Sequence, residues 1–374
     1  MLSCLDFYNE LTHRGINFFA GVPDSLLKDF CAYITDNVDS KNNIITANEG
    51  GAISLSSGYH LATGKIPLVY MQNSGQGNAV NPLTSLADPE VYKIPMILLI
   101  GWRGEPGVHD EPQHVKQGKI TLDLLVTLGI PYSILPQSLE EAKVCLNEMF
   151  ASLKEKGLPY ALVVRKDTFE HYELKNKLIT NYELGREDAL DLVLSELNEN
   201  DIIVSTTGML SRELFEYREK RKEGHEQDFL TVGSMGHASQ IALGIALQKP
   251  ERQVYCFDGD GALIMHMGAL AITGSQQVPN FRHVVFNNGS HDSVGGQPTV
   301  GFNIDITSIA KSCGYKIAIK AENSEELERG LRFLRENEGP SLLEIRVNKG
   351  ARKDLGRPST TPLQNKEAFM KHLR

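Results

Sequence analysis

The sequence contains few cysteines, and none of them lies close to another in the chain. Its 374 residues include five cysteines that form no Cys-x-x-Cys motif: Cys4, Cys31, Cys145, Cys256 and Cys313. This pattern indicates neither a disulfide framework nor an iron–sulfur or zinc cluster. Because unpaired cysteines are typical of reducing compartments, we expect a cytoplasmic protein.

Long apolar runs and an excess of positive charge are also missing. The longest apolar run, 95–102, is far too short to span a bilayer, and the first residues lack the order of a signal peptide. The 38 basic residues are outnumbered by 47 acidic ones, which argues against a protein that neutralises nucleic-acid phosphates. We therefore expect neither a membrane nor a nucleic-acid partner. The stretch from Arg346 onwards is an exception, because it is rich in lysine and arginine.

What the chain does contain is a steady alternation of strand-length apolar runs and helix-period segments. That alternation is typical of parallel sheets with helices on both faces. The segment 169–184 is charged and aperiodic, and it predicts a linker. We therefore predict an α/β protein of two doubly wound domains with mainly parallel sheets, 1–168 and 185–374.

The predicted elements follow from the same pattern. The strands expected in the two domains are 17–22, 43–47, 66–72, 95–101 and 160–165, and then 201–205, 229–233, 253–257, 281–286, 315–320 and 341–347. Helices are expected in the second domain at 186–197, 237–247, 262–274 and 324–335. In the first domain, Ser138 and Glu141 have the spacing of a capping box, and Gly157 ends the same helix.

Two polar clusters follow successive strands of the second domain. The run 258–262, Asp-Gly-Asp-Gly-Ala, follows one strand, and the run 287–290, Asn-Asn-Gly-Ser, follows the next. Because one right-handed crossover brings both strand ends to the carboxyl edge of the sheet, we expect Asp260 and the asparagine pair to meet there. Their oxygens suit Mg²⁺, and the glycines let the backbone approach a phosphate. A plain turn is the alternative for the Gly-Asp-Gly run taken by itself.

Neither glycine-rich run completes the dinucleotide fingerprint Gly-x-Gly-x-x-Gly. Gly259-Asp-Gly261 is followed by Ile264 where the third glycine belongs, and Gly75-Gln-Gly77 is followed by Val80. A nicotinamide-dependent dehydrogenase is therefore only a weak alternative.

Gly-Asp-Gly followed by Asn-Asn after one helix and one strand resembles the fingerprint of the thiamine-diphosphate enzymes. The resemblance implies the fold of that family, with a pyrimidine-binding first domain, a diphosphate-binding second domain, and thiamine diphosphate and Mg²⁺ as cofactors. By the same resemblance Asp260, Asn288 and the backbone carbonyl of Ser290 bind the metal, and Asn287 supports the loop. Further cofactor contacts implied in the second domain are Thr207, Gly233, Ser234, Met235, Gly259, Gly261 and Ala262. Met235 would be an apolar wedge under the cofactor, although core packing explains a lone methionine equally well.

In the first domain the resemblance points to residues that follow predicted strands. It implies that Glu49 is the glutamate that contacts the aminopyrimidine ring of the cofactor, and that Asn73 and Gly75 lie in the loop beside that ring. Asp24 resembles the active-site aspartate of the 2-oxoacid decarboxylases and is a candidate proton carrier. Helix capping is the alternative for both acids.

The chain has no room for the third domain that most 2-oxoacid decarboxylases of this family insert. Its GVPDS, NEGGA and GSMGH runs resemble members that decarboxylate, without oxidation, a 2-oxoacid carrying a phosphonate in phosphonate biosynthesis, or in a near neighbour a sulfonate. Such a substrate needs cationic groups, which an acidic protein must place locally. The candidates are Arg103, His109, His114, Arg352 and Arg357, and His114 is also a candidate catalytic proton carrier. A solvated loop or tail is the alternative for each of them.

The resemblance also bears on assembly. In this family the cofactor lies between the pyrimidine-side domain of one subunit and the diphosphate-side domain of another, so a homodimer or larger assembly is implied. A non-catalytic or partner-dependent subunit of a thiamine-dependent oxidoreductase is the alternative from a different class. Loss of Glu49 or Asp260 would be typical of a non-catalytic subunit, and the sequence keeps both.

Overall fold

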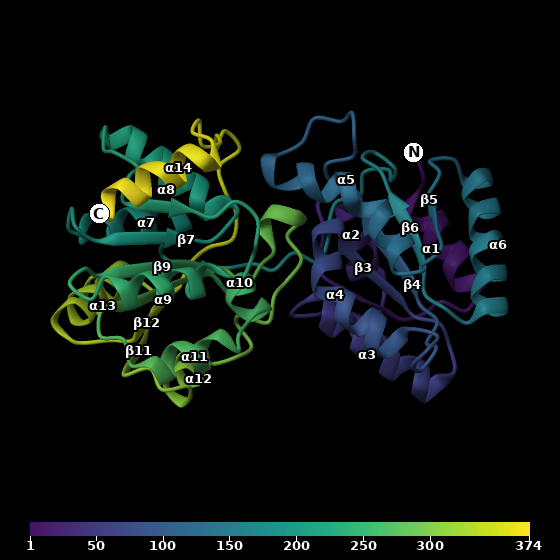
Figure 1. Ribbon diagram of the computed structural model, residues 1–374, viewed down its shortest axis with the longest axis horizontal. Helices are drawn as coiled ribbons and strands as arrows, with labels where there is room; N and C mark the ends of the chain where they lie inside the picture. Colours follow the sequence, from purple (N-terminus) through teal and green to yellow (C-terminus); the bar gives the residue numbers. More distant parts are fainter. The chain divides into compact units, whose positions relative to one another are not determined.

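The computed structural model describes residues 1–374, which divide into two compact units. The first unit comprises Met1–Lys177 together with Val294–Gln297, and the second comprises Leu178–Ser293 and Pro298–Arg374. The division after Lys177 falls within the segment 169–184 that we expected to be a linker. Each unit consists of one sheet with helices on both faces (Figure 1). None of the helices is long and apolar enough to cross a membrane.

The first unit contains a six-stranded sheet with the strand order β2-β1-β3-β4-β6-β5. Every pairing in it is parallel, as expected from the sequence. The strands are β1 (Phe19–Gly21), β2 (Asn43–Ile45), β3 (Leu68–Gln72), β4 (Ile97–Gly101), β5 (Tyr132–Ile134) and β6 (Tyr160–Val164). Strand β5 was not predicted, because its three residues lie half-buried at the sheet edge and give no apolar run.

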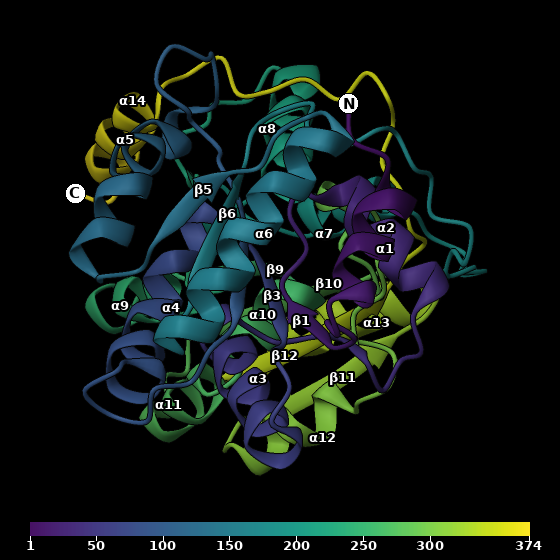
Figure 2. The same ribbon diagram turned by 90° about the vertical axis from the view of Figure 1, so that its right-hand side faces the viewer.

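Helices cover both faces of this sheet (Figure 2). On one face α1 (Cys4–His13), α2 (Lys28–Asn37) and α6 (Leu139–Lys156) bury an aromatic-rich core. On the other face lie α3 (Glu49–Thr63), α4 (Gln76–Pro82) and α5 (Pro112–Thr127). The predicted limits of α6 are confirmed, since Ser138 accepts a hydrogen bond from the Glu141 amide and Gly157 takes the left-handed conformation.

The second unit also contains a six-stranded parallel sheet, with the order β11-β12-β10-β9-β7-β8. Its strands are β7 (Ile202–Ser205), β8 (Asp228–Leu230), β9 (Val254–Gly259), β10 (Phe281–Asn287), β11 (Ile317–Ala321) and β12 (Ser341–Arg346). All six overlap the predicted strands. The register pairs Gly259 with Phe286, so the chain leaves β9 and β10 side by side.

The helices of the second unit again lie on two faces. One face carries α7 (Arg186–Ser195), α8 (Met209–Arg221) and α13 (Ser324–Glu336), and the other carries α9 (Ala238–Gln248), α11 (Ala269–Gln276) and α12 (Ile306–Ser312). The single helix predicted over 262–274 is wrong. The structure has α10 (Asp260–Met265) and then α11, because the backbone leaves the helical region at His266 and Gly268 disfavours a helix interior.

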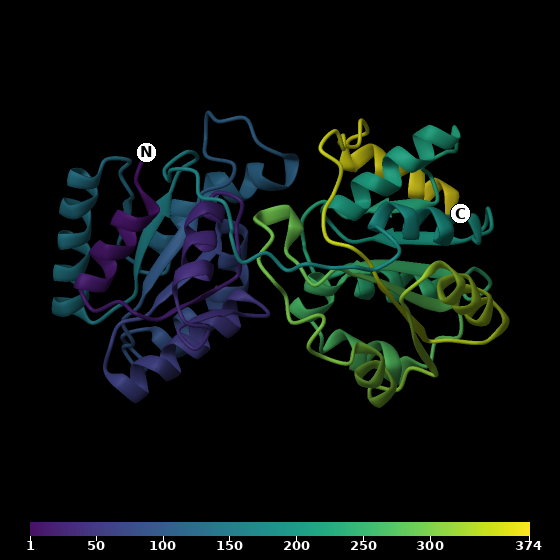
Figure 3. The same cartoon turned by 180° about the vertical axis from the view of Figure 1, so that it is seen from behind.

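The basic C-terminal stretch ends in a helix, α14 (Pro362–His372), which we did not predict. Figure 3 follows the chain beyond β12, drawn in yellow, to this helix. Phe369 is buried against Phe229, next to the edge strand β8. The Asn365 amide donates to the Asp228 carbonyl at 2.8 Å and accepts from the Leu230 amide at 3.2 Å, so it satisfies backbone groups of that edge.

Candidate active site

Glu49 is the first residue of α3 and lies just beyond the end of β2. Its side chain is buried, and its Oε2 accepts a hydrogen bond from Asn78 Nδ2 at 2.8 Å. Helix capping does not explain Glu49, because the Asn48 side chain caps α3 by accepting from the Gly51 amide at 2.9 Å. The Glu49 carboxylate also lies against Gly75, where any Cβ would overlap it. The structure therefore brings these two predicted residues together.

Asp24 follows β1 and is completely buried. Its Oδ1 accepts from Gln72 Nε2 at 2.7 Å, and its Oδ2 accepts from the Leu26 amide at 2.9 Å. Burial raises the pKa of the Asp24 carboxyl above its usual range, and these hydrogen bonds oppose that rise only in part. A carboxyl that holds its proton more tightly than usual is suited to proton transfer.

The raised pKa of Asp24 predicts a pH-dependent stability difference. This carboxyl ionises less readily in the folded protein than in the unfolded chain. The wild type should therefore lose stability as the pH rises from about 4 through the raised pKa. Asp24→Asn cannot ionise, so its free energy of unfolding relative to the wild type should increase between pH 4.5 and pH 8. Urea unfolding of both proteins at these pH values measures the difference.

Glu10→Gln is the matched control in the same unit. Hydrogen bonding to Arg14 lowers the pKa of Glu10, so ionised Glu10 contributes stability that is lost as the pH falls. Its variant should therefore show the opposite trend, becoming less stable relative to the wild type as the pH rises. A constant difference between Asp24→Asn and wild type would contradict the assigned direction for Asp24.

Arg103 lies beyond the end of β4, near Asp24, and its guanidinium is oriented by Asp110. Nε donates to Asp110 Oδ2 at 2.8 Å, Nη2 donates to Oδ1 at 2.5 Å, and Nη1 donates to Ser25 Oγ at 2.6 Å. Burial acts to raise the pKa of Asp110, but the hydrogen bonds from Arg103 and two backbone amides lower it by more. The pKa is therefore well below its usual range, and this carboxylate is ionised. A guanidinium has five N–H donors, so two remain for a ligand after these three bonds.

The other predicted residues of the first unit differ in burial. Asn73 is fully buried, donates to the Arg103 carbonyl at 2.7 Å and to Thr121 Oγ1 at 2.8 Å, and accepts from the Arg103 amide. Its side chain therefore fixes the loop after β4. His114 is buried in the first turn of α5, whereas His109 is exposed on the loop before that helix.

In the second unit Asp260 begins α10, directly after β9. The residue is 2% exposed, and its carboxylate is hydrogen-bonded by the Thr299 hydroxyl and by backbone amides and has no lysine or arginine partner. Burial raises the pKa of Asp260 to about 6. A buried carboxylate without a positive partner is costly, and a bound cation would compensate its charge.

Asn287 and Asn288 follow β10 and have different environments. Asn287 donates to the Gly301 carbonyl at 2.8 Å and to Glu344 Oε1 at 2.7 Å, so its amide braces the loop. Asn288 Oδ1 accepts from the Ser290 amide at 3.0 Å and Nδ2 donates to Asp292 at 2.8 Å. The Ser290 hydroxyl is buried and has no hydrogen-bond partner. The buried side-chain oxygens of Asp260 and Asn288, on two adjacent strand ends, fit a hard cation such as Mg²⁺, and the backbone carbonyl of Ser290 stays the predicted third ligand.

The loop after β8 lies beside this edge. The Gly233 amide donates to Thr207 Oγ1 at 3.0 Å, and Gly233, Ser234 and Gly236 all have positive φ. Gly261 lies between this loop and His291, the residue after the 287–290 run: a Cβ there would lie 3.5 Å from the Met235 methyl and 3.3 Å from the His291 ring. The structure therefore places Met235 next to Gly261, and Ala262 is buried.

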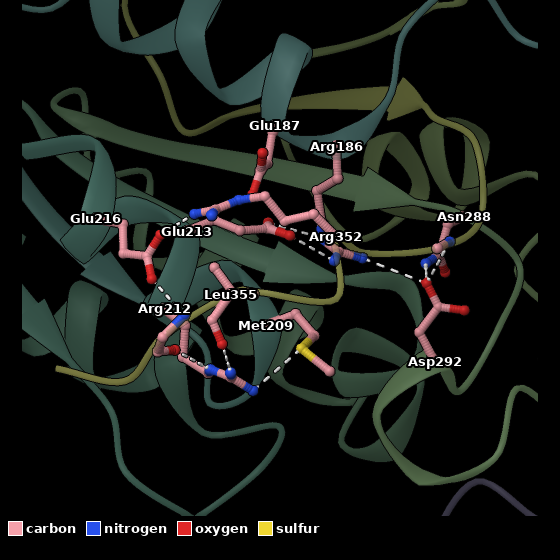
Figure 4. A network of polar contacts seen from close by, with 12 residues as sticks. Arg186, Glu187, Met209, Arg212, Glu213, Glu216, Asn288, Asp292, Arg352 and Leu355 are labelled. Carbon is pink, nitrogen blue, oxygen red and sulfur yellow. Dashed lines mark hydrogen bonds and ion pairs between the residues drawn. The ribbon is translucent and has the colours of Figure 1, made fainter. Parts of the chain in front are cut away.

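Of the two predicted substrate contacts in the C-terminal stretch, Arg352 lines a pocket of about 320 Å³, together with Met209, Arg212, Asp292, Gly350, Ala351, Lys353 and Leu355. Arg352 is ion-paired with Glu187 and Glu216 (Figure 4) and with Asp354, so its charge is balanced within the protein. Arg357 is exposed beyond the pocket. The Arg212 guanidinium donates to the Gly356 and Leu355 carbonyls and holds this stretch against α8.

Sequence reasoning missed the side chains that orient the predicted residues. Asn78 binds Glu49, Gln72 binds Asp24, Thr299 binds Asp260 and Asp292 binds Asn288. Gln72 ends a predicted strand, which was a usable signal. The segment 291–301 is aperiodic and gave none for Thr299 or Asp292.

Family models match a part of each unit. The family model "Thiamine pyrophosphate enzyme, N-terminal TPP binding domain" matches residues 6–124. The model "Thiamine pyrophosphate enzyme, C-terminal TPP binding domain" matches residues 206–345. Thiamine pyrophosphate is another name for thiamine diphosphate, and the two matches cover the Glu49 and Asp260 regions respectively.

Curated relatives match over nearly the whole chain. Phosphonopyruvate decarboxylase of Streptomyces viridochromogenes is 33% identical over 384 residues, covering 99% of this chain and 94% of the relative. The enzyme of the same name from Streptomyces hygroscopicus is 32% identical, covering 97% and 92%. Sulfopyruvate decarboxylase of Methanosarcina acetivorans is 27% identical, covering 91% and 90%.

Proposed function

This chain belongs to the thiamine pyrophosphate enzymes, and we propose that within this family it decarboxylates 3-phosphonopyruvate to phosphonoacetaldehyde and CO₂. The observation that carries the proposal is the joint presence of buried Glu49 in one unit and the Asp260–Asn288 oxygen cluster in the other. The phosphonate is favoured over a sulfonate because the phosphonopyruvate decarboxylases are 33% and 32% identical, against 27% for the sulfopyruvate decarboxylase.

The candidate site residues would have different roles in this reaction. Thiamine diphosphate, when bound, accepts the electron pair left by the departing carboxylate. Asp260, Asn288 and Ser290 would hold Mg²⁺ with the diphosphate, and Glu49 would exchange a proton with the aminopyrimidine. The keto carbon must gain a proton in place of the carboxylate. Asp24 would carry that proton, and the raised pKa of its buried carboxyl supports this role.

Arg103 is the best supported contact for the substrate anion. Asp110 and Ser25 fix the plane of its guanidinium and leave two N–H donors free, and the fork geometry of arginine suits a carboxylate or phosphonate. His114 is a buried alternative and His109 an exposed one. Arg352 must first leave its acidic partners to bind substrate, so its contribution requires movement of the C-terminal stretch.

The test is CO₂ release by the purified protein with thiamine diphosphate and Mg²⁺, from phosphonopyruvate, sulfopyruvate and pyruvate in parallel. We expect kcat/KM to be highest for phosphonopyruvate. In Arg103→Met, which keeps the apolar stem and removes the charge, we expect kcat/KM for phosphonopyruvate to fall by about 10–100-fold, as for loss of a charge-assisted pair. Preference for sulfopyruvate would contradict the proposed substrate, and equal rates on pyruvate would contradict a second anion site.

We further propose that the active enzyme is a homodimer or a larger assembly whose sites combine Glu49 of one subunit with Asp260 of another. Membership of the family supports this arrangement. Sedimentation of the holoenzyme tests the assembly, and a monomer that retains full activity would contradict it.

A further inference from the structure

Asp292 connects the 287–290 loop to two distant parts of the second unit (Figure 4). Its side chain is 10% exposed. A single oxygen, Oδ2, accepts from Asn288 Nδ2 at 2.8 Å, from the Gly350 amide at 2.8 Å and from Arg186 Nη1 at 3.5 Å. The three donors come from the loop after β10, the stretch after β12 and the first turn of α7.

The partner of Asn288 decides which end of its carboxamide is available to a cation. A carboxylate only accepts hydrogen bonds, so Asp292 selects the NH₂ end of Asn288. The oxygen end then points the other way, where Oδ1 accepts from the Ser290 amide and keeps a second lone pair. Rotating the amide by 180° would place Oδ1 against the Asp292 carboxylate and Nδ2 against the Ser290 N–H, and both contacts are repulsive.

The Asp292 carboxylate is itself held in place by the core. Arg186 pairs with Glu213 through two hydrogen bonds of 2.7 and 2.6 Å, and both side chains are almost fully buried. This pair joins α7 to α8 and presents the third guanidinium nitrogen to Asp292. Gly350 approaches with φ of +114°, a conformation that residues with a side chain rarely adopt.

We infer that Asp292 is a positioning residue that fixes the amide orientation of Asn288 and thereby prepares Asn288 Oδ1 to bind the cation. The inference rests on the proposed role of Asn288 as a metal ligand and on no property of the substrate. Mutation of a residue that hydrogen-bonds a metal ligand commonly lowers metal affinity by about 10–100-fold, and we expect a loss of this size when Asp292 is replaced. Asp292 acts by orienting Asn288 Oδ1 through its hydrogen bond to Nδ2, and its negative charge is not required.

The test measures binding of Mn²⁺ to the full chain with saturating thiamine diphosphate, using the electron paramagnetic resonance signal of free Mn²⁺. Asp292→Leu removes the acceptor while keeping the branched shape of the side chain, and it should weaken Mn²⁺ binding by about 10–100-fold. Asp292→Asn can place its amide oxygen where Oδ2 stands, so it should stay within about threefold of the wild type. Glu187→Gln is the matched control, because it loosens Arg352 on the same stretch without touching Asp292 or Asn288.

The outcomes separate this inference from the proposed function. Wild-type affinity in a folded Asp292→Leu would overturn the inference, and so would an Asp292→Asn that is as weak as Asp292→Leu. If Asp292→Leu does not unfold cooperatively without metal, Asp292→Ala replaces it with the same expectation. A wild type that binds no Mn²⁺ together with thiamine diphosphate would overturn the cofactor site itself, and the inference with it.

Discussion

Glu49→Gln should lower kcat by about 10²–10⁴-fold while leaving the affinity for thiamine diphosphate within about threefold. Glutamine keeps the shape of Glu49 and can still accept from Asn78, but it cannot exchange a proton with the aminopyrimidine. The loss should therefore appear in the chemical step and hardly at all in binding. Steady-state rates of CO₂ release and calorimetric titration with thiamine diphosphate measure the two quantities on the same preparation.

Gly75→Ala tests the same carboxylate without changing it. A Cβ at position 75 would overlap the Glu49 side chain, so kcat should fall although the glutamate is present. Gly77→Ala is the matched control, because a Cβ there meets nothing within 4 Å. If both single variants, Gly75→Ala and Glu49→Gln, kept full activity, Glu49 would have no role in the chemical step.

The second large effect is expected at Asp260, at the diphosphate end of the cofactor. Asp260→Ala should weaken Mg²⁺-dependent binding of thiamine diphosphate by more than about 10²-fold, because it removes the only anionic oxygen of the cluster formed with Asn288 and Ser290. Titration of the protein with thiamine diphosphate, in the presence and in the absence of Mg²⁺, measures the metal-dependent part of the binding affinity. The variant protein should remain folded, since removing a buried unpaired carboxylate also removes its desolvation cost.

Asp305→Ala is the control for Asp260→Ala. Asp305 caps α12 of the same unit by accepting from the Ser308 amide, so its loss should cost about 1 kcal/mol of stability and leave cofactor binding unchanged. Cofactor binding by Asp260→Ala that depends on Mg²⁺ as strongly as in the wild type would exclude Asp260 as a ligand.

The two inactive variants can also be combined. If one site uses Glu49 of one subunit and Asp260 of another, mixing Glu49→Gln with Asp260→Ala subunits should restore some sites with both native residues. Recovery of up to about a quarter of wild-type activity is the statistical expectation for a dimer with random exchange. Mixtures that exchange subunits and stay inactive would contradict shared sites.

The strand ends were the part of the site that sequence could predict. Runs of buried strand residues are visible in the chain, and a parallel sheet sends all their carboxyl ends to one edge. For this reason Asp260 and Asn288, 28 positions apart in the printed sequence, were expected to meet, and the β9–β10 register confirms that their strands are neighbours. Glu49 and Gly75 lie at the edge of the other sheet in the same way.

The partners of these residues were not predictable because they depend on loops. Asp110 lies between the candidate cations His109 and His114, and nothing in the spacing indicated that it would pair with Arg103. Thr299 and Asp292 lie in a segment without periodicity, so only the folded backbone brings them to Asp260 and Asn288. The amide orientation of Asn288 is a three-dimensional property that no linear pattern encodes.

The contact between Asn365 and β8 has a consequence for biosynthesis. Leu230 leaves the ribosome 135 residues before Asn365. The Asn365 side chain later accepts the hydrogen bond from the Leu230 backbone amide. Until then the nascent second unit displays an open sheet edge, the kind of surface that recruits strands from neighbouring chains. Translation of the last helix is therefore the step that ends this exposure. Chaperone binding to stalled nascent chains should drop once α14 has emerged.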